Sequence, residues 1–344
     1  MATPKLKLTM LGTTGSGKTT FLLGMYNTMS LGVQGYFLYT EDPDEGFDLG
    51  EAWDRLIEGG ELPQPTAEDQ SKRYQFVFNH GFDTLVTVEW LDYRGGAMIG
   101  RANSASDVAQ LRGQLGASDS IYLVFDGGKL TPWLDGKASI TSVQKELRIR
   151  EMTQLVQHAI QDRKRNNLPL PSLVVVITKA DLLAGPGRMV WDALTTIIDN
   201  LKTLVEAAYV EGVTTLLCPV QVGNFGPTRP LKVDVRDIDP MGLHRPMIFS
   251  LMHYLSEGLG AHQAQLTTQR AGQSAVDQQI AALNQGFLAY FRGRRIAQLQ
   301  DVSASYARAI EDQQQQYHAN QSLISRLAAE LEGHPIIRNG KVEL

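Results

Sequence analysis

The chain has 344 residues, a net charge of −5 and 43% apolar residues. This length suits one large α/β domain with an appendage, and the apolar content suits a globular protein with a sizeable core. The acidic balance argues against a general nucleic-acid-binding surface, although short basic runs occur at 163–165 and 292–295.

The cysteine content and the apolar segments bear on the compartment. Cys218 is the only cysteine, so no disulfide can form within the chain, and a reducing compartment is expected. The first residues, MATPKLKLTMLG, lack the apolar segment of a secretion signal. No uncharged apolar run reaches the roughly 20 residues that a membrane-spanning helix needs. We therefore expect a cytoplasmic protein.

Strands and helices are predicted to alternate over residues 1–255. The segment NHGFD joins two apolar runs and predicts a hairpin. The pattern predicts an α/β fold of the P-loop NTPase type, with a mostly parallel sheet flanked by helices and one antiparallel edge hairpin. Strands are expected at 5–11, 74–78, 85–91, 121–125, 173–177 and 214–220, and helices at 19–30, 49–58, 143–166 and 189–209.

The composition changes after residue 255. Gln and Ala dominate, and apolar residues recur at heptad-like steps of three and four. The steps are interrupted at FRGR, so we expect two long helices, arranged either as an antiparallel hairpin or as one kinked rod. The expected organisation is an α/β domain at 1–255, a coiled-coil-like helical arm at 256–333 and a tail at 334–344 that forms a loop or a short strand.

The first chemical motif is GTTGSGKT, which matches G-x-x-x-x-G-K-[ST] at every fixed position. Its glycines let backbone N–H groups surround a phosphate, and the following helix adds its positive end. Lys18 would contact the β- and γ-phosphates during catalysis, and Thr19 would bind Mg²⁺. The residues expected around the nucleotide are Gly12, Thr13, Thr14, Gly15, Ser16, Gly17, Lys18, Thr19 and Thr20.

Two further segments are expected to complete the phosphate site. In LDYRG, Asp92 ends an apolar run and would hold Mg²⁺ through a water molecule, while the amide of Gly95 meets the γ-phosphate. In LPQPT, Thr66 is the expected γ-phosphate sensor, with its hydroxyl on Mg²⁺. Thr40 is the alternative sensor, and Thr66 could also be a solvent-facing loop residue.

The choice of base follows from LVVVITKAD, where an apolar run ends in TKAD, a variant of [NT]-K-x-D. The carboxylate of Asp181 would accept the N1–H and N2–H₂ donors of guanine, a pair that adenine lacks. Lys179 would lay its aliphatic stem over the base, and Thr178 would tie this turn to the phosphate loop. Gln221 and Val222 are candidates for the amide that meets guanine O6. The expected cofactors are therefore GTP or GDP and Mg²⁺.

In order, GTTGSGKT, Thr66, DYRG and TKAD resemble the G1 to G4 elements of translation-factor-class (Ras-like) P-loop GTPases, over roughly residues 5–255. The segments DYRGG, PQPT and DPMGLHRPMIFSLMHYL are similar to the bacterial double-GTPase-like domains of conflict systems, which are found beside partner genes. The resemblance implies a nucleotide-gated regulatory switch that works with other proteins.

The sequence departs from the Ras-like pattern at one catalytic position. Ras-like domains carry Gln directly after DxxG to orient the attacking water, and this chain has Gly96. We therefore expect slow intrinsic hydrolysis. Arg94 could stabilise charge on the transferring phosphoryl group, or it could be an exposed switch residue or partner contact. His244 could be taken for a catalytic base, but we expect it to cap or pack against the following helix.

Other functions stay open. An ATPase or a P-loop kinase is disfavoured by TKAD, whereas Gly96 keeps a nucleotide-binding module without turnover possible. The helical arm could bind a protein partner or self-associate. Alternatively, GFLAYFRGRR at 286–295 could touch a membrane, as in dynamin-like GTPases, or its aromatic residues could be buried against the α/β domain. We expect no nucleic-acid partner.

Overall fold

The computed structural model describes residues 4–63, 71–93, 105–226, 232–284 and 293–343. The chain divides into two compact units, one formed by residues 1–250 and 331–344 and the other by residues 251–330. The first is an α/β unit and the second is helical, as the predicted fold class requires. The tail at 334–344 is part of the first unit and extends its sheet.

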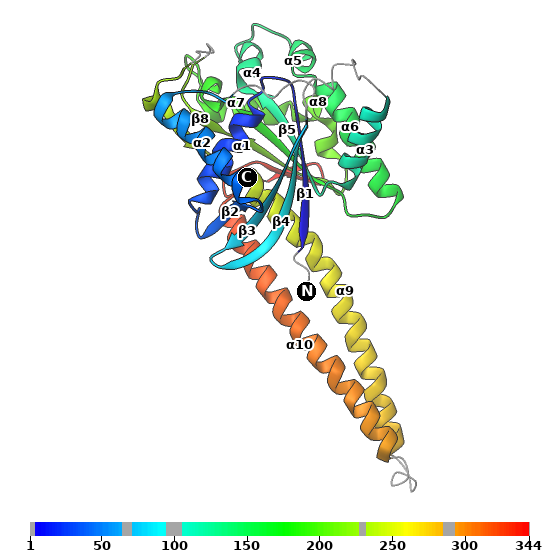
Figure 1. Ribbon diagram of the computed structural model, residues 1–344. Helices are drawn as coiled ribbons and strands as arrows, with labels where there is room; N and C mark the ends of the chain where they lie inside the picture. Colours follow the sequence, from blue (N-terminus) through cyan, green and yellow to red (C-terminus); the bar gives the residue numbers. More distant parts are fainter. Residues whose placement is uncertain (1–3, 64–70, 94–104, 227–231, 285–292, 344) are drawn as a thin grey trace. The chain divides into compact units, whose positions relative to one another are not determined.

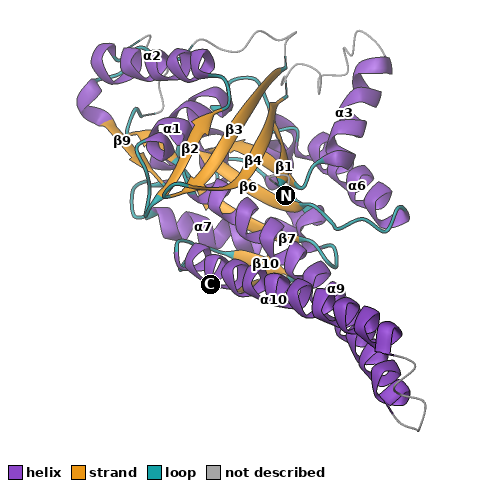
Figure 2. Ribbon diagram, turned by 60° about the horizontal axis from the view of Figure 1, so that its bottom comes forward, coloured by secondary structure: helices purple, strands orange, loops and turns teal. Residues whose placement is uncertain are grey.

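Nine strands of the described chain form one sheet, in the order β11-β10-β7-β6-β5-β1-β4-β3-β2 (Figure 2). The five strands from β4 to β7 in this order are parallel, and antiparallel strands extend the sheet at both ends. They are β1 (Lys5–Gly12), β2 (Tyr36–Thr40), β3 (Lys72–His80), β4 (Asp83–Asp92), β5 (Ser120–Asp126), β6 (Ser172–Thr178), β7 (Thr214–Pro219), β10 (Ile336–Arg338) and β11 (Lys341–Glu343).

Helices surround this sheet, and a small antiparallel sheet joins β8 (Gln221–Gly223) to β9 (Ile238–Met241). No helix in the described part of the chain combines the length and the apolar character that crossing a bilayer requires. The helices are α1 (Lys18–Ser30), α2 (Pro43–Gly59), α3 (Ala105–Ala117), α4 (Gly127–Leu134), α5 (Ile140–Glu146), α6 (Ile149–Arg165), α7 (Val190–Asp199), α8 (Leu201–Leu204), α9 (Arg245–Asn284) and α10 (Gly293–Ala329).

The core lies on both faces of the central strands, which is why β5 and β6 are buried along their whole length. On one face, the ring of Phe21 in α1 lies 6.2 Å from the ring of Trp90 and 6.4 Å from that of Tyr122. On the other face, alternate residues of β5 such as Leu123 cluster with side chains of α3 and α6 such as Met152. Covered in this way, the strands hold their carboxyl ends in fixed positions.

Two predicted helices are broken where the backbone leaves the helical conformation. The helix expected at 143–166 is divided into α5 and α6, because Arg148 between them takes a left-handed φ of 53°. The segment expected to be helical at 189–209 forms α7, α8 and a 3₁₀ turn (Glu206–Tyr209). Spacing of apolar residues predicts a helical face, but it does not reveal a single residue that interrupts the helix.

Other elements were missed or begin earlier than predicted. The helix expected at 49–58 begins at Pro43, where the side chain of Asp42 accepts a hydrogen bond from Asp44 N and caps the first turn. Five further elements were not predicted, namely β2, α3, α4, β8 and β9. Helix α9 starts before the expected arm, and the tail forms β10 and β11, which add a second antiparallel edge beside β7.

The helical unit is an antiparallel hairpin formed by α10 and the part of α9 from residue 251 onwards (Figure 1). Ser303 Oγ donates to Asp277 Oδ1 at 2.7 Å, and Gln313 Nε2 donates to Gln265 Oε1 at 3.3 Å. As the chain advances along α10, its contacts move backwards along α9, so the two helices are antiparallel. The hairpin alternative is confirmed, and the single kinked rod is wrong.

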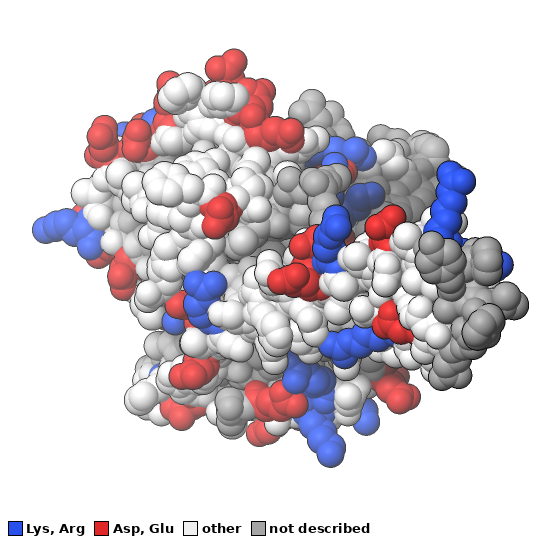
Figure 3. Space-filling view, turned by 90° about the horizontal axis from the view of Figure 1, so that it is seen from below, with Lys and Arg blue, Asp and Glu red and all other residues white. Residues whose placement is uncertain are grey.

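The surface carries both signs of charge. On the face shown in Figure 3, the described Lys and Arg side chains are interspersed with Asp and Glu. Exposed ion pairs in the described part of the chain include Lys137 with Asp135 and Arg236 with Asp234. Exposed pairs of this kind contribute little to stability.

Candidate functional site

The phosphate loop (residues 12–19) leads from β1 into α1. Gly15 and Gly17 have φ values of 78° and 84°, a left-handed region that glycine occupies without strain. Ser16 N donates to Thr13 O at 3.1 Å and closes the turn. Helix α1 begins at Lys18, so its positive end lies at the loop.

Lys18 is folded back across this loop. Its side chain is buried, with 9% exposure, and Nζ donates to Gly12 O at 3.0 Å and to Thr13 O at 3.3 Å. Burial lowers the pKa of Lys18, and the nearby carboxylate of Asp92 opposes this change. A phosphate in the loop would offer the ammonium group a full negative charge, which two carbonyl dipoles supply only in part.

Asp92 ends β4 and is paired in the sheet with Met10 of β1, next to the phosphate loop. It is 3% exposed, and Oδ1 has no hydrogen-bond partner among the described residues. Burial raises the pKa of Asp92 to about 6, although Lys18 acts in the opposite direction. A buried carboxylate oxygen without a partner is a fitting ligand for Mg²⁺, directly or through water.

The residues expected at the metal fit Mg²⁺ rather than a metal held in a protein cage. The described part of the chain contains no group of three or more His, Cys, Asp or Glu residues that could hold a metal ion by themselves. Mg²⁺ is commonly bound by one or two protein oxygens together with nucleotide phosphates. Asp92 and the hydroxyl of Thr19, the second residue of α1, would supply that protein part.

Thr178, the last residue of β6, joins the turn after this strand to the phosphate loop. Its hydroxyl lies 2.6 Å from Ser16 O and 3.2 Å from Phe125 O, so it can donate to either carbonyl. This is the tie that the sequence analysis assigned to Thr178. The contact links two segments that lie more than a hundred residues apart, and it ties the turn at residues 178–181 (the base turn) to the phosphate loop.

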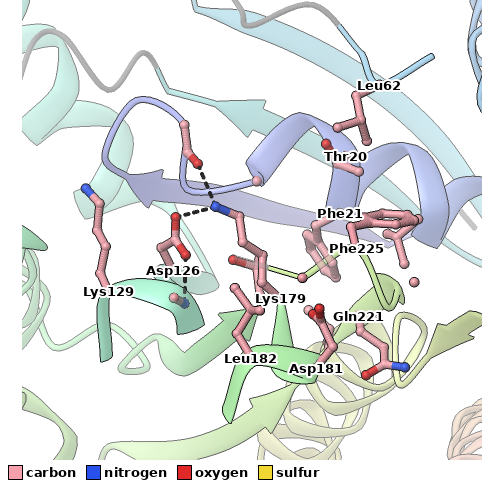
Figure 4. A pocket seen from close by; sticks show the side chains of 18 of the residues that line it. Thr20, Phe21, Leu62, Asp126, Lys129, Lys179, Asp181, Leu182, Gln221 and Phe225 are labelled. Atoms are coloured by element: carbon pink, nitrogen blue, oxygen red, sulfur yellow. Dashed lines mark hydrogen bonds and ion pairs between the residues drawn. The ribbon is translucent and has the colours of Figure 1, made fainter. Parts of the chain in front are cut away.

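A cavity of about 480 Å³ opens between these segments (Figure 4). Its volume is in the range of small-molecule sites. Of the residues predicted to bind nucleotide, Gly12, Thr13, Ser16, Lys18 and Thr19 do not line the cavity and lie along the phosphate loop beside it. Those that line it are Thr14, Gly15, Gly17, Thr20, Thr178, Lys179, Asp181, Gln221 and Val222.

Asp181 follows β6 and is half-buried at the cavity. Burial raises the pKa of Asp181, whereas hydrogen bonds from backbone N–H groups, including those of Phe225 and Gly226, lower it. Backbone N–H groups therefore already lie close to this carboxylate. A planar edge with two adjacent N–H donors would bind the same group.

Gln221 and Val222 lie where β8 passes the cavity. Gln221 is 8% exposed, and its Nε2 donates to Asp239 O of β9 at 3.3 Å. The side-chain amide is therefore engaged in holding the small sheet. The backbone amide of this segment therefore stays a prediction for the contact with the base edge.

Several residues that line the cavity were not predicted from the sequence. Asp126 ends β5 and forms an ion pair with Lys179. The segment FDGGK carries a signal for it, because an Asp followed by glycines after a strand is typical of a helix N-cap. The remaining side chains that were missed in the lining are Phe21, Leu62, Lys129, Leu182, Val220, Phe225 and Leu243.

Some predicted residues cannot be placed in this cavity. Thr66, Arg94 and Gly95 lie outside the described residues, as does Gly96. Thr40, the alternative sensor, is the last residue of β2 and does not line the cavity. His244 does not line the cavity either. It is half-buried, and burial, with smaller contributions from Arg245 and His334, lowers its pKa to about 4.

No protein-family model matches this chain, and no curated protein matches it. Solved structures that are similar include two crystal structures of the Saccharomyces cerevisiae Ski7 GTPase-like domain. The one bound to GDP and inorganic phosphate is 16% identical with a TM-score of 0.38, and the one bound to GTP is 18% identical with a TM-score of 0.37. Each match covers 63% of this chain and 43% of the other. Similarity at this level carries no argument about function.

The buried carboxyl of Asp92 predicts a pH-dependent difference between the wild type and Asp92→Asn. The pKa of about 6 in the folded state lies above the ordinary value, so the folded protein loses stability as the pH rises from about 4 to 6 and this carboxyl ionises. In the nucleotide-free protein at pH 7, Asp92→Asn should therefore be more stable by about 1–3 kcal/mol, with little difference at pH 4. Urea denaturation at both pH values measures this.

Asp83→Asn, at the exposed start of the same strand, is the matched control and should show no such gain. An equal effect of Asp92→Asn at pH 4 and pH 7 would contradict the assignment of a buried, ionisable carboxyl.

Proposed function

We propose that this chain is a GTP-binding protein that hydrolyses GTP slowly with Mg²⁺ and acts as a nucleotide-gated regulatory switch. One observation carries the proposal: Asp181 lines the same cavity as Gly15 and Gly17 of the phosphate loop. A guanine nucleotide needs a loop that binds its phosphates and a carboxylate that accepts the two N–H donors of its base. Both line one cavity here.

The preference for guanine over adenine rests on hydrogen-bond chemistry. Guanine presents N1–H and N2–H₂ side by side, and a carboxylate accepts both. Adenine presents an acceptor at N1, which an ionised Asp181 would repel. Discrimination between two ligands is large when the wrong one leaves a buried polar group of the site without a hydrogen-bond partner. An ATPase or a P-loop kinase is therefore the weaker alternative.

In this proposal, some groups at the phosphate loop would bind the phosphates and others would bind Mg²⁺. The backbone N–H groups of the loop and the N-terminus of α1 would hold the phosphates, and Lys18 would leave the carbonyls of Gly12 and Thr13 for the β- and γ-phosphates. Asp92 and Thr19 would hold Mg²⁺, which neutralises phosphate charge when it is bound. We also propose that the chain is related to the bacterial double-GTPase-like domains of conflict systems.

Nucleotide calorimetry with Asp181→Asn tests the assigned base. The wild type should bind GDP and GTP at least about 100-fold more tightly than ADP and ATP. The amide that replaces the carboxylate would accept from N1–H but donate toward C2, so the variant should lose guanine affinity and prefer xanthosine diphosphate, whose C2 carries a carbonyl. Tight ATP binding with indifference to guanine would overturn the proposal.

Turnover should be slow, because Gly96 supplies no side chain that could orient water. We expect a kcat for GTP at or below about 10⁻³ s⁻¹, the order of an unassisted Ras-like domain.

Single-turnover rates of Arg94→Ala then separate the two roles of this residue. A loss of rate at unchanged GTP affinity assigns it to the transferring phosphoryl group, and an unchanged rate leaves it as a switch or partner contact. Binding without any turnover would favour the alternative of a nucleotide-binding interaction module.

The helical hairpin is the part that we propose for protein partners or for self-association, with the membrane-touching segment at 286–295 as the minor alternative. Residues 251–330 form a compact unit that contains none of the residues lining the cavity. If the hairpin self-associates under nucleotide control, sedimentation of the full chain should differ between GDP and a non-hydrolysable GTP analogue. Lys18→Ala should abolish the difference, and identical sedimentation in both states would contradict gated self-association. Flotation with anionic vesicles tests the membrane alternative.

A further inference from the structure

Asp126 is a buried carboxylate at the edge of the cavity that the phosphate and base motifs do not include. It is the last residue of β5 and is 5% exposed. Its Oδ1 accepts a hydrogen bond from Gly128 N at 2.9 Å and caps α4. Its Oδ2 forms an ion pair with Lys179 Nζ (Figure 4). One carboxylate thus joins the start of a helix to the turn after β6.

Lys179 spans the gap between this carboxylate and the phosphate loop. Asp126 and Thr178 are register partners in the parallel pair β5–β6, so Lys179 begins directly beside Asp126. Its backbone takes a left-handed φ of 52°, and its Nζ also lies 3.5 Å from Gly15 O. The aliphatic stem of Lys179, between its backbone and Nζ, lines the cavity.

The backbone around this pair has no room for adjustment. A Cβ atom at Gly127 would lie 2.7 Å from both Thr178 O and Lys179 O, which is closer than such atoms can approach. The start of α4 therefore packs directly on the turn that carries Lys179. This packing fixes where the lysine side chain starts, and Asp126 fixes where its charged end lies.

We propose that Asp126 is a positioning residue for guanine-nucleotide binding, which acts by holding Lys179 extended along the base site. The inference rests on the proposed function of this cavity. Without the carboxylate, the ammonium of Lys179 would lose its counter-charge and would be drawn toward any other anion in the cavity, including nucleotide phosphate. The stem would then leave the place where it can cover a base.

The competing role for Asp126 is structural, as the N-cap of α4 alone. The two roles separate because Asn caps a helix as well as Asp does but carries no charge. Asp126→Asn keeps the acceptor for Gly128 N and loses the ion pair. Lys179→Met keeps the aliphatic stem and loses the ammonium group.

A double-mutant cycle on the full chain tests the inference, with GDP affinity measured by calorimetry. We expect Asp126→Asn to weaken GDP binding about tenfold, because a half-buried ammonium loses its only carboxylate partner among the ion pairs of the described residues. In the Lys179→Met background, the same substitution should change affinity less than twofold. Asp135→Asn is the matched control, because Asp135 is the C-cap of α4 and pairs with Arg188 outside the cavity lining, and it should leave affinity within twofold.

An equal effect of Asp126→Asn with and without Lys179 would overturn the inference and leave Asp126 as a helix cap, and so would no effect in either background. Thermal melts of all variants monitor the cap, which Asp126→Asn should preserve. If the wild type binds ADP but not GDP, the proposed function fails, and the same cycle run with ADP still decides the role of Asp126. If it binds neither nucleotide, both are overturned.

Discussion

Parallel pairing of β1, β5 and β6 is the constraint on which the candidate site depends. In a parallel sheet, the carboxyl ends of neighbouring strands lie at the same edge, and loops that leave this edge form the ligand site. Here those ends are Gly12, Asp126 and Thr178, which open the phosphate loop, the start of α4 and the base turn. Burial of β5 and β6 on both faces keeps these ends in register.

Side chains then convert this alignment into fixed geometry. The hydroxyl of Thr178 bridges to the carbonyl of Ser16, and the carboxylate of Asp126 holds the ammonium of Lys179. Each contact joins segments that are remote in sequence, and both cross the junction between the base turn and its neighbours. Because the backbones at this junction touch, as at Gly127, the side chains have few alternative positions. The turn after β6 and the phosphate loop are thereby held together.

The sequence predicts the parts of this site that depend on local chemistry. The phosphate loop was recognisable because glycines at fixed positions set a backbone path, and TKAD because it ends an apolar strand. Asp126 was missed because its partner, Lys179, is remote in sequence, and only the sheet register brings the two together. The break at Arg148 was missed for a related reason, since a left-handed residue leaves no mark in the spacing of apolar positions. The edge strands β2, β10 and β11 are short, and their pairing depends on neighbours that the sequence does not identify.

The electrostatics of the phosphate loop favour a ligand that brings both signs of charge. Lys18 and Asp92 are buried beside each other, and burial disfavours the charged form of each, lowering the pKa of the lysine and raising that of the aspartate. Their mutual attraction offsets only part of this cost. A phosphate alone would stabilise Lys18 but would repel the carboxylate of Asp92, and a cation alone would do the reverse. A metal–phosphate pair satisfies both groups at once, so binding of the anion and binding of the cation should favour each other at this loop.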